Sequence, residues 1–282
     1  MNRVYGRSDD ELAVLPLGLA PGMFEGQVVV VSGAGSGIGR ATAHWFARLG
    51  AKVVLCGRTP EKLERTAEAL ARYSTETLVH PLSIRDPEAV EALFEAAWSR
   101  FGRVNVLVNN AGGQFPQAAI DFKPKGWNAV VDTNLNGTWY MMQSAARKWR
   151  DAGMPGAIVN VVAAITRGMP GIAHTCAARA GVIYASKTVA IEWAPFNIRI
   201  NCVAPGITAT EGMNVYPPEV VAEMPNTNLL RKFAEPEDVA NAICYLAGET
   251  GRFMTGEVLT LDGGHQLWGD QWTIPKPEFF KV

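Results

Sequence analysis

Net charge, long apolar runs and metal-binding cysteine spacings are all scarce in this sequence. The 282 residues carry 26 Lys and Arg against 27 Asp and Glu, a formal net charge of -1, so no general attraction to nucleic acid or anionic membranes is expected. No apolar run reaches the roughly 18 residues of a membrane-spanning helix, and no basic-then-apolar leader opens the chain. The four cysteines lack metal-ligand spacing, which predicts reduced thiols and no metal site. We therefore expect a cytoplasmic protein.

The most informative stretch is an apolar run at 28–31 followed by Ser32-Gly33-Ala34-Gly35-Ser36-Gly37-Ile38-Gly39. A helical apolar pattern and a second strand at 51–56 come next. Glycines permit a sharp turn and the close approach of a diphosphate to the backbone, and the start of the helix supplies free N–H groups. The order of strand, glycine-rich turn and helix predicts dinucleotide binding. The expected contacts come from Ser32, Gly33, Ser36, Gly37, Ile38 and Gly39.

Strand and helix patterns alternate through the rest of the chain. This alternation predicts an α/β fold, a single-domain Rossmann-type doubly wound parallel sheet with helices on both faces. The length and the uniform composition favour one large core. We expect an N-terminal surface arm at 1–25, the dinucleotide-binding domain at 26–265 with a lid at about 207–233, and a tail at 266–282 that lies at an interface.

The second strand ends in Cys56-Gly57-Arg58-Thr59-Pro60. In dinucleotide folds an acidic residue here binds the ribose 2′-hydroxyl, whereas an arginine accommodates a 2′-phosphate. Gly57 has no side chain for the hydroxyl, and the Arg58 guanidinium suits phosphate. We therefore predict NADP(H) as the cofactor. The alternative is a solvated arginine at the end of a strand.

Two polar stretches follow apolar segments farther along the chain. Asn109-Asn110-Ala111-Gly112 ends a strand at the edge where open parallel sheets bind ligands, and Gly113-Gln114-Phe115 should line the mouth of the site. The run Asp132-Thr133-Asn134-Leu135-Asn136-Gly137 is bracketed by apolar residues. Buried polar groups need partners, so these amides either cap neighbouring backbone or build an active site.

Taken together, the motifs resemble the short-chain dehydrogenase/reductase family over about residues 25–265. They are the glycine-rich turn, Asn109–Gly112, Asn134, Pro205-Gly206 with Thr210, and Asp262-Gly263-Gly264. Within the family, segments such as 112–115, 125–127, 177–182 and 199–206 are most similar to peroxisomal-type trans-2-enoyl-CoA reductases, followed by 2,4-dienoyl-CoA reductases. The resemblance implies further cofactor contacts from Ile84, Asn110, Ala111, Gly112, Arg179, Pro205, Gly206 and Thr210.

The family's usual catalytic side chains are replaced at three of four positions. The serine position falls at Ala163 (or Val162), the tyrosine position at Thr175 and the lysine position at Arg179, while Asn134 is retained. Arginine still supplies positive charge and donors for ribose hydroxyls, but threonine is a far poorer proton donor than tyrosine. Simple ketone reduction therefore fits poorly. Reduction of an enoyl thioester fits better, because hydrogen-bond donors can stabilise an enolate oxygen without a strong acid.

The proton donor stays open between several residues. The enoyl-CoA reductase subgroup uses a tyrosine one turn later on the same helix, a position that holds Ile183 here with Tyr184 beside it. One residue corresponds to about 100° of helix, so Tyr184 is either catalytic or a packing or interface tyrosine. Tyr140 and His174 are the other candidates. The expected catalytic set is Asn134, Arg179, Tyr184 and Thr175.

Three functions remain in competition at this point. The leading one is an NADPH-dependent oxidoreductase that reduces the conjugated C=C of an enoyl thioester, so that the partner is a small molecule of acyl-CoA type. The second is an alcohol or ketone oxidoreductase with a relocated proton donor. The third is an NADP(H)-binding protein that has lost catalysis.

Apolar residues on several faces of the helices after Asn128 and Cys176 predict burial against another subunit. The family resemblance implies a homotetramer built through these helices. Trp268 and Trp272 in the tail are expected at an interface or over a neighbouring active site.

Overall fold

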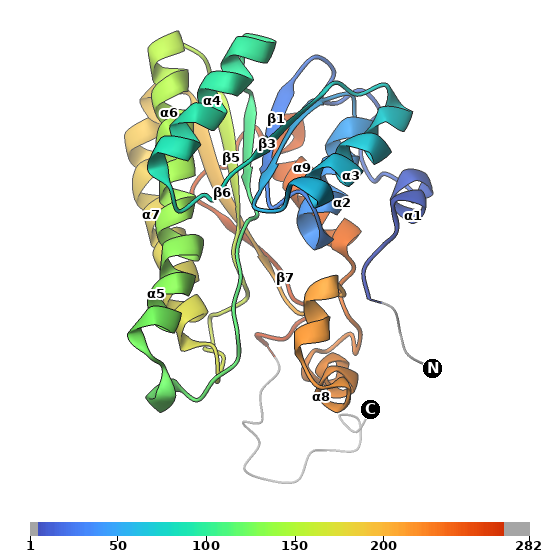
Figure 1. The fold of residues 1–282 in the computed structure, drawn as a ribbon, viewed down its shortest axis with the longest axis vertical. Helices are drawn as coiled ribbons and strands as arrows, with labels where there is room; N and C mark the ends of the chain where they lie inside the picture. The colour runs from blue at the N-terminus through green and yellow to red at the C-terminus, as the bar shows by residue number, and fades with distance from the viewer. Residues whose placement is uncertain (1–4, 268–282) are drawn as a thin grey trace.

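The computed structural model describes residues 5–267 and shows a parallel sheet with helices on both faces (Figure 1). Its seven strands are arranged in the order β3-β2-β1-β4-β5-β6-β7, and every neighbouring pair is parallel. The strands are β1 (Val28–Ser32), β2 (Lys52–Gly57), β3 (Thr77–Pro81), β4 (Val106–Asn109), β5 (Gly156–Val161), β6 (Ile198–Pro205) and β7 (Val258–Leu261). The predicted doubly wound α/β fold is confirmed.

Nine α-helices connect and cover these strands within the described residues. They are α1 (Asp9–Val14), α2 (Gly37–Arg48), α3 (Pro60–Leu70), α4 (Pro87–Phe101), α5 (Pro124–Val131), α6 (Thr138–Ala152), α7 (Ala173–Trp193), α8 (Pro218–Glu223) and α9 (Pro236–Ala247). Helices α4, α6 and α7 cover one face of the sheet, and α2, α3 and α9 cover the other (Figure 1). No described helix is long and apolar enough to cross a membrane.

Strand β1 shows why its sequence is an unbroken apolar run. Val28 and Val30 pack into the core on the side of α4 and α6, whereas Val29 and Val31 pack into the core on the side of α2 and α9. Alternate residues of a strand point to opposite faces, and both faces of this parallel sheet are covered. Because β1 lies between β2 and β4, the glycine-rich turn that follows β1 lies inside the carboxyl edge of the sheet and not at its end.

The N-terminal segment is packed more closely than an arm lying on the surface. Leu12 of α1 and Phe24 are fully buried in the core beside α2. His44 of α2 anchors the segment through Asp9, whose Oδ1 lies 3.1 Å from the His44 Nε2. The expected arm is therefore part of the folded domain over residues 5–25.

The segment expected as a lid folds into short helices beyond the carboxyl edge of the sheet. It contains η5 (Glu211–Val215), α8 and η6 (Met224–Thr227), and it buries Val221 and Phe233 in a small core of its own. Its two ends are joined because Ala209 N–H donates to the Ala234 carbonyl at 2.8 Å. Trp268 and Trp272, which were expected at an interface or over a neighbouring active site, lie outside the described residues.

Candidate active site

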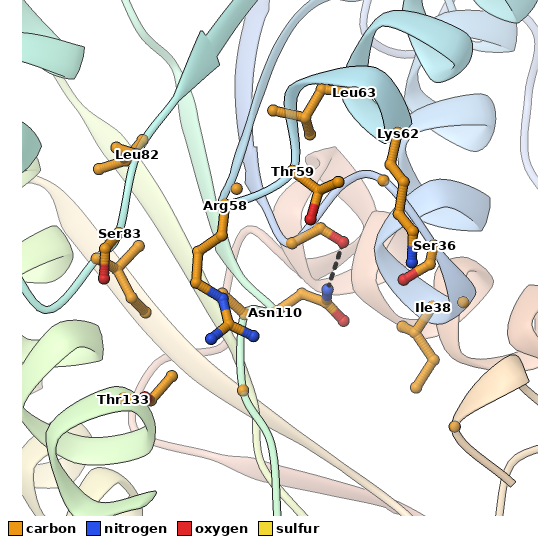
Figure 2. A pocket seen from close by; sticks show the side chains of 18 of the residues that line it. Ser36, Ile38, Arg58, Thr59, Lys62, Leu63, Leu82, Ser83, Asn110 and Thr133 are labelled. Carbon is orange, nitrogen blue, oxygen red and sulfur yellow. Dashed lines mark hydrogen bonds between the residues drawn. The ribbon is translucent and has the colours of Figure 1, made fainter. Parts of the chain in front are cut away.

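Two cavities with shared walls lie along the carboxyl edge of the sheet. The first, of about 360 Å³, follows the turn after β1 and the loops after β2, β3 and β4 (Figure 2). Ten of the expected cofactor contacts line it: Gly33, Ser36, Gly37, Ile38, Arg58, Ile84, Asn110, Ala111, Gly112 and Thr210. The second, of about 540 Å³, is enclosed by the ends of β5 and β6 and by the lid, and Pro205, Gly206 and Arg179 line it.

The glycine-rich turn has the conformation that the sequence predicts for close backbone approach. Gly33 and Gly37 have φ angles of +68° and +51°, which side-chain-bearing residues rarely adopt. A Cβ on Gly39 would lie 2.2 Å from the Gly33 carbonyl oxygen, so Gly39 serves the packing of α2 and does not line the cavity. The turn therefore exposes bare backbone and the start of α2 to a ligand.

Ser32 and Asn110 tie the turn to the end of β4. The buried Ser32 Oγ accepts hydrogen bonds from the N–H groups of Asn110 and Ala111, each at 3.0 Å. The Asn110 Nδ2 donates to the Ser32 carbonyl at 3.0 Å. The structure thus places Ser32 behind the cavity wall, where it positions the two loops, whereas Asn110 lines both cavities.

Two basic side chains extend into the first cavity. Arg58 follows β2 and Lys62 belongs to the first turn of α3, and both line this cavity with Thr59 and Ser83 (Figure 2). No ion pair is recorded for Arg58 or Lys62 within residues 5–267. Their charges are therefore available to an anionic group, and the cavity fits a dinucleotide.

Asn134 is held by a π-helical segment (Asp132–Gly137) between α5 and α6, which is the polar run noted in the sequence. Its side chain is fully buried and bonds Gly113 twice, accepting from the N–H at 3.0 Å and donating to the carbonyl at 2.9 Å. The Asn134 Nδ2 also donates to the Thr175 Oγ1 at 2.8 Å. Asn134 and Thr175 therefore support the loop after β4 from behind the cavity wall.

Arg179 reaches the second cavity from α7. It is only 8% exposed, and its Nη1 donates to the Val161 carbonyl at 2.8 Å. A Cβ on Gly112 would lie 2.1 Å from the Arg179 Nη2, so glycine at 112 leaves room for the guanidinium. Burial lowers the pKa of Arg179 to about 10, which still leaves it positively charged at neutral pH. The site thus contains one buried cation.

Tyr184 lies apart from the other three expected catalytic residues. Its side chain is 70% exposed on α7 and lines neither cavity. The side chain one position away from the subgroup's tyrosine points outward because each residue rotates the helix by about 100°. This placement does not fit a proton donor and corrects the catalytic expectation for Tyr184.

The other two donor candidates also lie outside the cavities. Tyr140 packs at the edge of the core beside α4 and α6. The His174 ring is buried between Phe115 and Phe122, with centroids 4.7 and 4.5 Å away. Its Nδ1 accepts the Thr175 N–H at 2.8 Å, so the ring proton is on Nε2, which has no hydrogen-bond partner among the described residues.

Sequence reasoning missed a tyrosine that does face the second cavity. Tyr216 of the lid lines it, and the Tyr216 hydroxyl accepts a hydrogen bond from the Gln114 Nε2 at 3.1 Å. His265 lines the same cavity. Tyr216 lies in a segment without hydrophobic periodicity, so only the expectation of a lid pointed to it. His265 directly follows the Asp262-Gly263-Gly264 motif, which was the one sequence signal for its position.

Comparisons with known proteins agree with this geometry. A family model described as Enoyl-(Acyl carrier protein) reductase matches residues 33–266. A probable 2,4-dienoyl-CoA reductase of Bacillus subtilis is 34% identical over 258 residues, which covers 90% of this chain and 99% of the relative. A 3-oxoacyl-(acyl-carrier-protein) reductase of Thermotoga maritima is 35% identical over 245 residues, 85% of this chain and 98% of the relative.

Solved structures give the same result. A citronellol catabolism dehydrogenase of Pseudomonas aeruginosa superposes with a TM-score of 0.80 at 36% identity, covering 89% of this chain and 99% of that one. The family match at 33–266 begins directly after β1 and covers the glycine-rich turn from Gly33 and the other six strands. This chain is a member of the short-chain dehydrogenase/reductase family, and its relatives include proteins named as 2,4-dienoyl-CoA reductases.

Proposed function

We propose that this protein is an NADPH-dependent reductase that acts on the conjugated C=C of an enoyl thioester. The observation that carries the proposal is the second cavity, which holds the buried Arg179 cation but has Ala163 where the family has its serine. Such a site suits a reaction whose developing charge is an enolate oxygen, which donors and positive charge stabilise. The relatives named as 2,4-dienoyl-CoA reductases support the same class of substrate.

The preference for NADPH is supported by the first cavity. Arg58 and Lys62 place two positive charges in it, and glycine precedes Arg58 where an acidic residue would bind a ribose hydroxyl. Gly33, Gly37 and the start of α2 would hold the diphosphate. When bound, the cofactor supplies a hydride for the substrate carbon.

The chain's own residues divide the remaining work. Arg179 would hold the nicotinamide ribose hydroxyls and keep a positive charge beside the reacting atoms. Asn134 and Thr175 hold the loop at Gly113 in place through three hydrogen bonds of 2.8 to 3.0 Å. Met169, Met213 and Met224 give the cavity an adaptable apolar wall for an acyl chain. Tyr216 is our proposed proton donor, because it lines this cavity and its hydroxyl is held by Gln114, which lines the same cavity.

A spectrophotometric assay of NADPH oxidation tests the proposal. The substrates are crotonyl-, octenoyl- and dienoyl-CoA beside matched free ketones, with wild type, Tyr216→Phe and the matched control Tyr184→Phe. We expect turnover of an enoyl-CoA, a loss of about 100-fold or more in Tyr216→Phe if it is the general acid, and an unchanged rate in Tyr184→Phe.

The same assay separates the alternatives. Turnover of ketones alone would favour an alcohol or ketone oxidoreductase, a function that relatives named as dehydrogenases and 3-oxoacyl reductases support. Bound NADPH without turnover of either substrate class would favour a cofactor-binding protein that has lost catalysis. Equal losses in both tyrosine variants would remove Tyr216 from its proposed role.

We also propose a cytoplasmic homotetramer. Tyr184 and Ile191 leave large apolar surfaces exposed on α7, at 70% and 80%, and Trp139 of α6 contacts Trp193 of α7 with ring centroids 6.3 Å apart. An exposed apolar face of this kind is typical of a subunit interface. Light scattering coupled to size-exclusion chromatography should give four times the 30.4 kDa chain mass; a monomer would contradict the proposal.

A further inference from the structure

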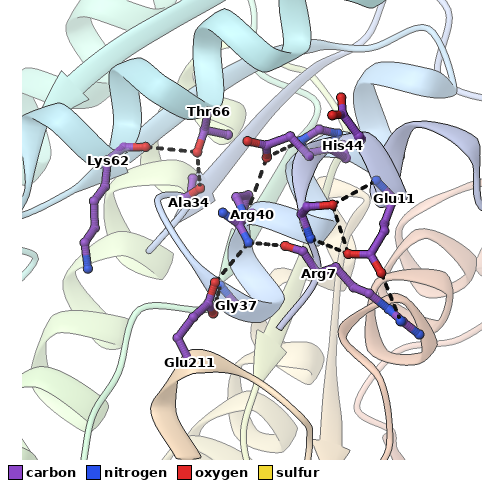
Figure 3. Close-up of polar contacts among 12 residues, drawn as sticks. Arg7, Glu11, Ala34, Gly37, Arg40, His44, Lys62, Thr66 and Glu211 are labelled. Atoms are coloured by element: carbon purple, nitrogen blue, oxygen red, sulfur yellow. Dashed lines mark hydrogen bonds and ion pairs between the residues drawn. The ribbon is translucent and has the colours of Figure 1, made fainter. Parts of the chain in front are cut away.

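The first turn of α2 already binds an anionic side chain. Ser36 at the start of this helix makes no side-chain capping hydrogen bond. Instead, the Gly37 N–H donates to the Glu211 Oε2 at 3.1 Å (Figure 3). Glu211 lines the first cavity beside Ser36 and Ile38. A carboxylate from the lid thus occupies the positive end of the helix, where anions bind favourably.

Other contacts hold Glu211 in this position. The Arg40 Nη2 donates to the Glu211 Oε1 at 2.9 Å and also to the Arg7 carbonyl, so that Glu211 is bound between two donors of α2 (Figure 3). Gly6, with φ of +92°, packs against the carboxyl group, because a Cβ there would lie 2.9 Å from the Glu211 Cδ. The Arg40 side chain is 11% exposed and that of Glu211 38%, so water screens the contact only in part.

We propose that Glu211 is an internal competitor of the dinucleotide diphosphate, which must displace its carboxylate from Gly37 in order to bind. This inference rests on the proposed function, which assigns the first cavity to NADPH. Two anions cannot share one N–H group without strong repulsion. The apparent cofactor affinity is therefore the intrinsic affinity multiplied by the fraction of molecules in which Glu211 has left the turn.

The competition connects cofactor binding to the substrate cavity. Thr210 and Gly212, the neighbours of Glu211, line both cavities, and Met213 and Tyr216 of the same segment line the second. When Glu211 leaves Gly37, the lid segment that carries the proposed proton donor loses one of its attachments to α2. Glu211 is thus a residue that sets cofactor affinity, and it acts on substrate binding through the lid.

Calorimetric titration of the purified full chain tests this proposal. The variants are Glu211→Gln and Glu211→Ala, with Glu219→Gln as the matched control, since Glu219 is an exposed lid carboxylate that lines neither cavity. The ligands are NADPH and adenosine 2′-phosphate, which can occupy the Arg58 end but has no diphosphate. Thermal melting of each variant confirms that it is folded.

We expect both Glu211 variants to bind NADPH roughly ten-fold more tightly than wild type, a gain of the size of one charge-assisted hydrogen bond. The affinity for adenosine 2′-phosphate should change by less than about two-fold, since this ligand has no diphosphate that competes with Glu211 for the Gly37 N–H. Glu219→Gln should match wild type. Unchanged or weaker NADPH binding in the Glu211 variants, or an equal gain for both ligands, would overturn the proposal.

The titrations also distinguish this inference from the proposed function. If wild type binds NADPH but turns over no substrate, the proposed reaction fails, whereas the competition is still decided by the variants. If NADPH binds only the Glu211 variants, the competition is confirmed in its strongest form. If no protein binds a dinucleotide, both the proposed function and the inference fail.

Discussion

A single methyl group added at Gly112 should disable the site without unfolding the protein. The Cβ of Gly112→Ala would lie 2.1 Å from the Arg179 Nη2 and 3.1 Å from the Asn134 Oδ1. Ordinary contacts begin near 3.4 Å, so the guanidinium must move by about 1 Å, and a misplacement of that size can cost roughly 100-fold in rate. The pKa of Arg179, about 10, keeps the side chain charged at neutral pH, so the test addresses position and not charge.

Gly113→Ala is the matched control, because a Cβ there meets no atom within 4 Å. With an enoyl-CoA substrate, we expect kcat/KM to fall about 100-fold in Gly112→Ala and to stay within about three-fold of wild type in Gly113→Ala. Both variants should melt near the wild-type temperature, since Arg179 is a long side chain that can move. Equal kcat/KM in the two variants would refute the claim that the guanidinium must lie beside Gly112.

Three further predictions concern the cofactor end, the buried amide and the N-terminal segment. Arg58→Ala should weaken NADPH binding by about 10- to 100-fold, the range expected for a lost charged hydrogen bond, and leave NADH binding nearly unchanged in the same titration. Asn134→Ala removes three buried hydrogen bonds and should lower the free energy of unfolding by about 2–4 kcal/mol in urea melts. The control Asn136→Ala loses one bond to Asp132 and should lower it by about 1 kcal/mol or less. Equal losses in the two variants would contradict the role of Asn134 as a buried support of the loop after β4. Burial lowers the pKa of His44 from 6.5 to about 4, so the unfolded chain binds more protons than the folded chain between these pH values. The free energy of unfolding should therefore fall as the pH drops from 6.5 toward 4. In melting curves recorded across this range, His44→Gln should reduce the dependence of the melting temperature on pH.

The parts of this molecule that the sequence predicts are those in which neighbours in the chain are also neighbours in space. The turn at Gly33 and Gly37 is made by one contiguous segment, and its φ angles follow from residue type. The loop at Asn110 directly follows a strand that ends in amides, so the chain order alone predicts its place at the carboxyl edge of the sheet. Arg58 follows the second strand directly, so the topology of the fold alone brings it to the same edge.

The residues that sequence reasoning misplaced or missed depend on helix rotation or on contacts between distant segments. Tyr184 lies on the predicted helix, but one residue of rotation turns it outward. Tyr216 and Glu211 belong to a lid whose path is set by packing of Val221 and Phe233, and no periodic pattern encodes that path. The contact between Gly37 and Glu211 joins residues 174 positions apart, which a reading of local patterns cannot foresee.

These two classes of residue meet at the shared wall of the cavities. Ile38, Asn110 and Gly112 come from the predictable turn and strand, and Thr210 and Gly212 come from the unpredictable lid, yet all five line both cavities. The chain is similar at nearly the same identity to a 2,4-dienoyl-CoA reductase and to a 3-oxoacyl reductase. We propose that the turn sets the cofactor and that residues 207–233 set the choice of substrate, so that changes in these residues alone should alter substrate preference while cofactor binding is kept.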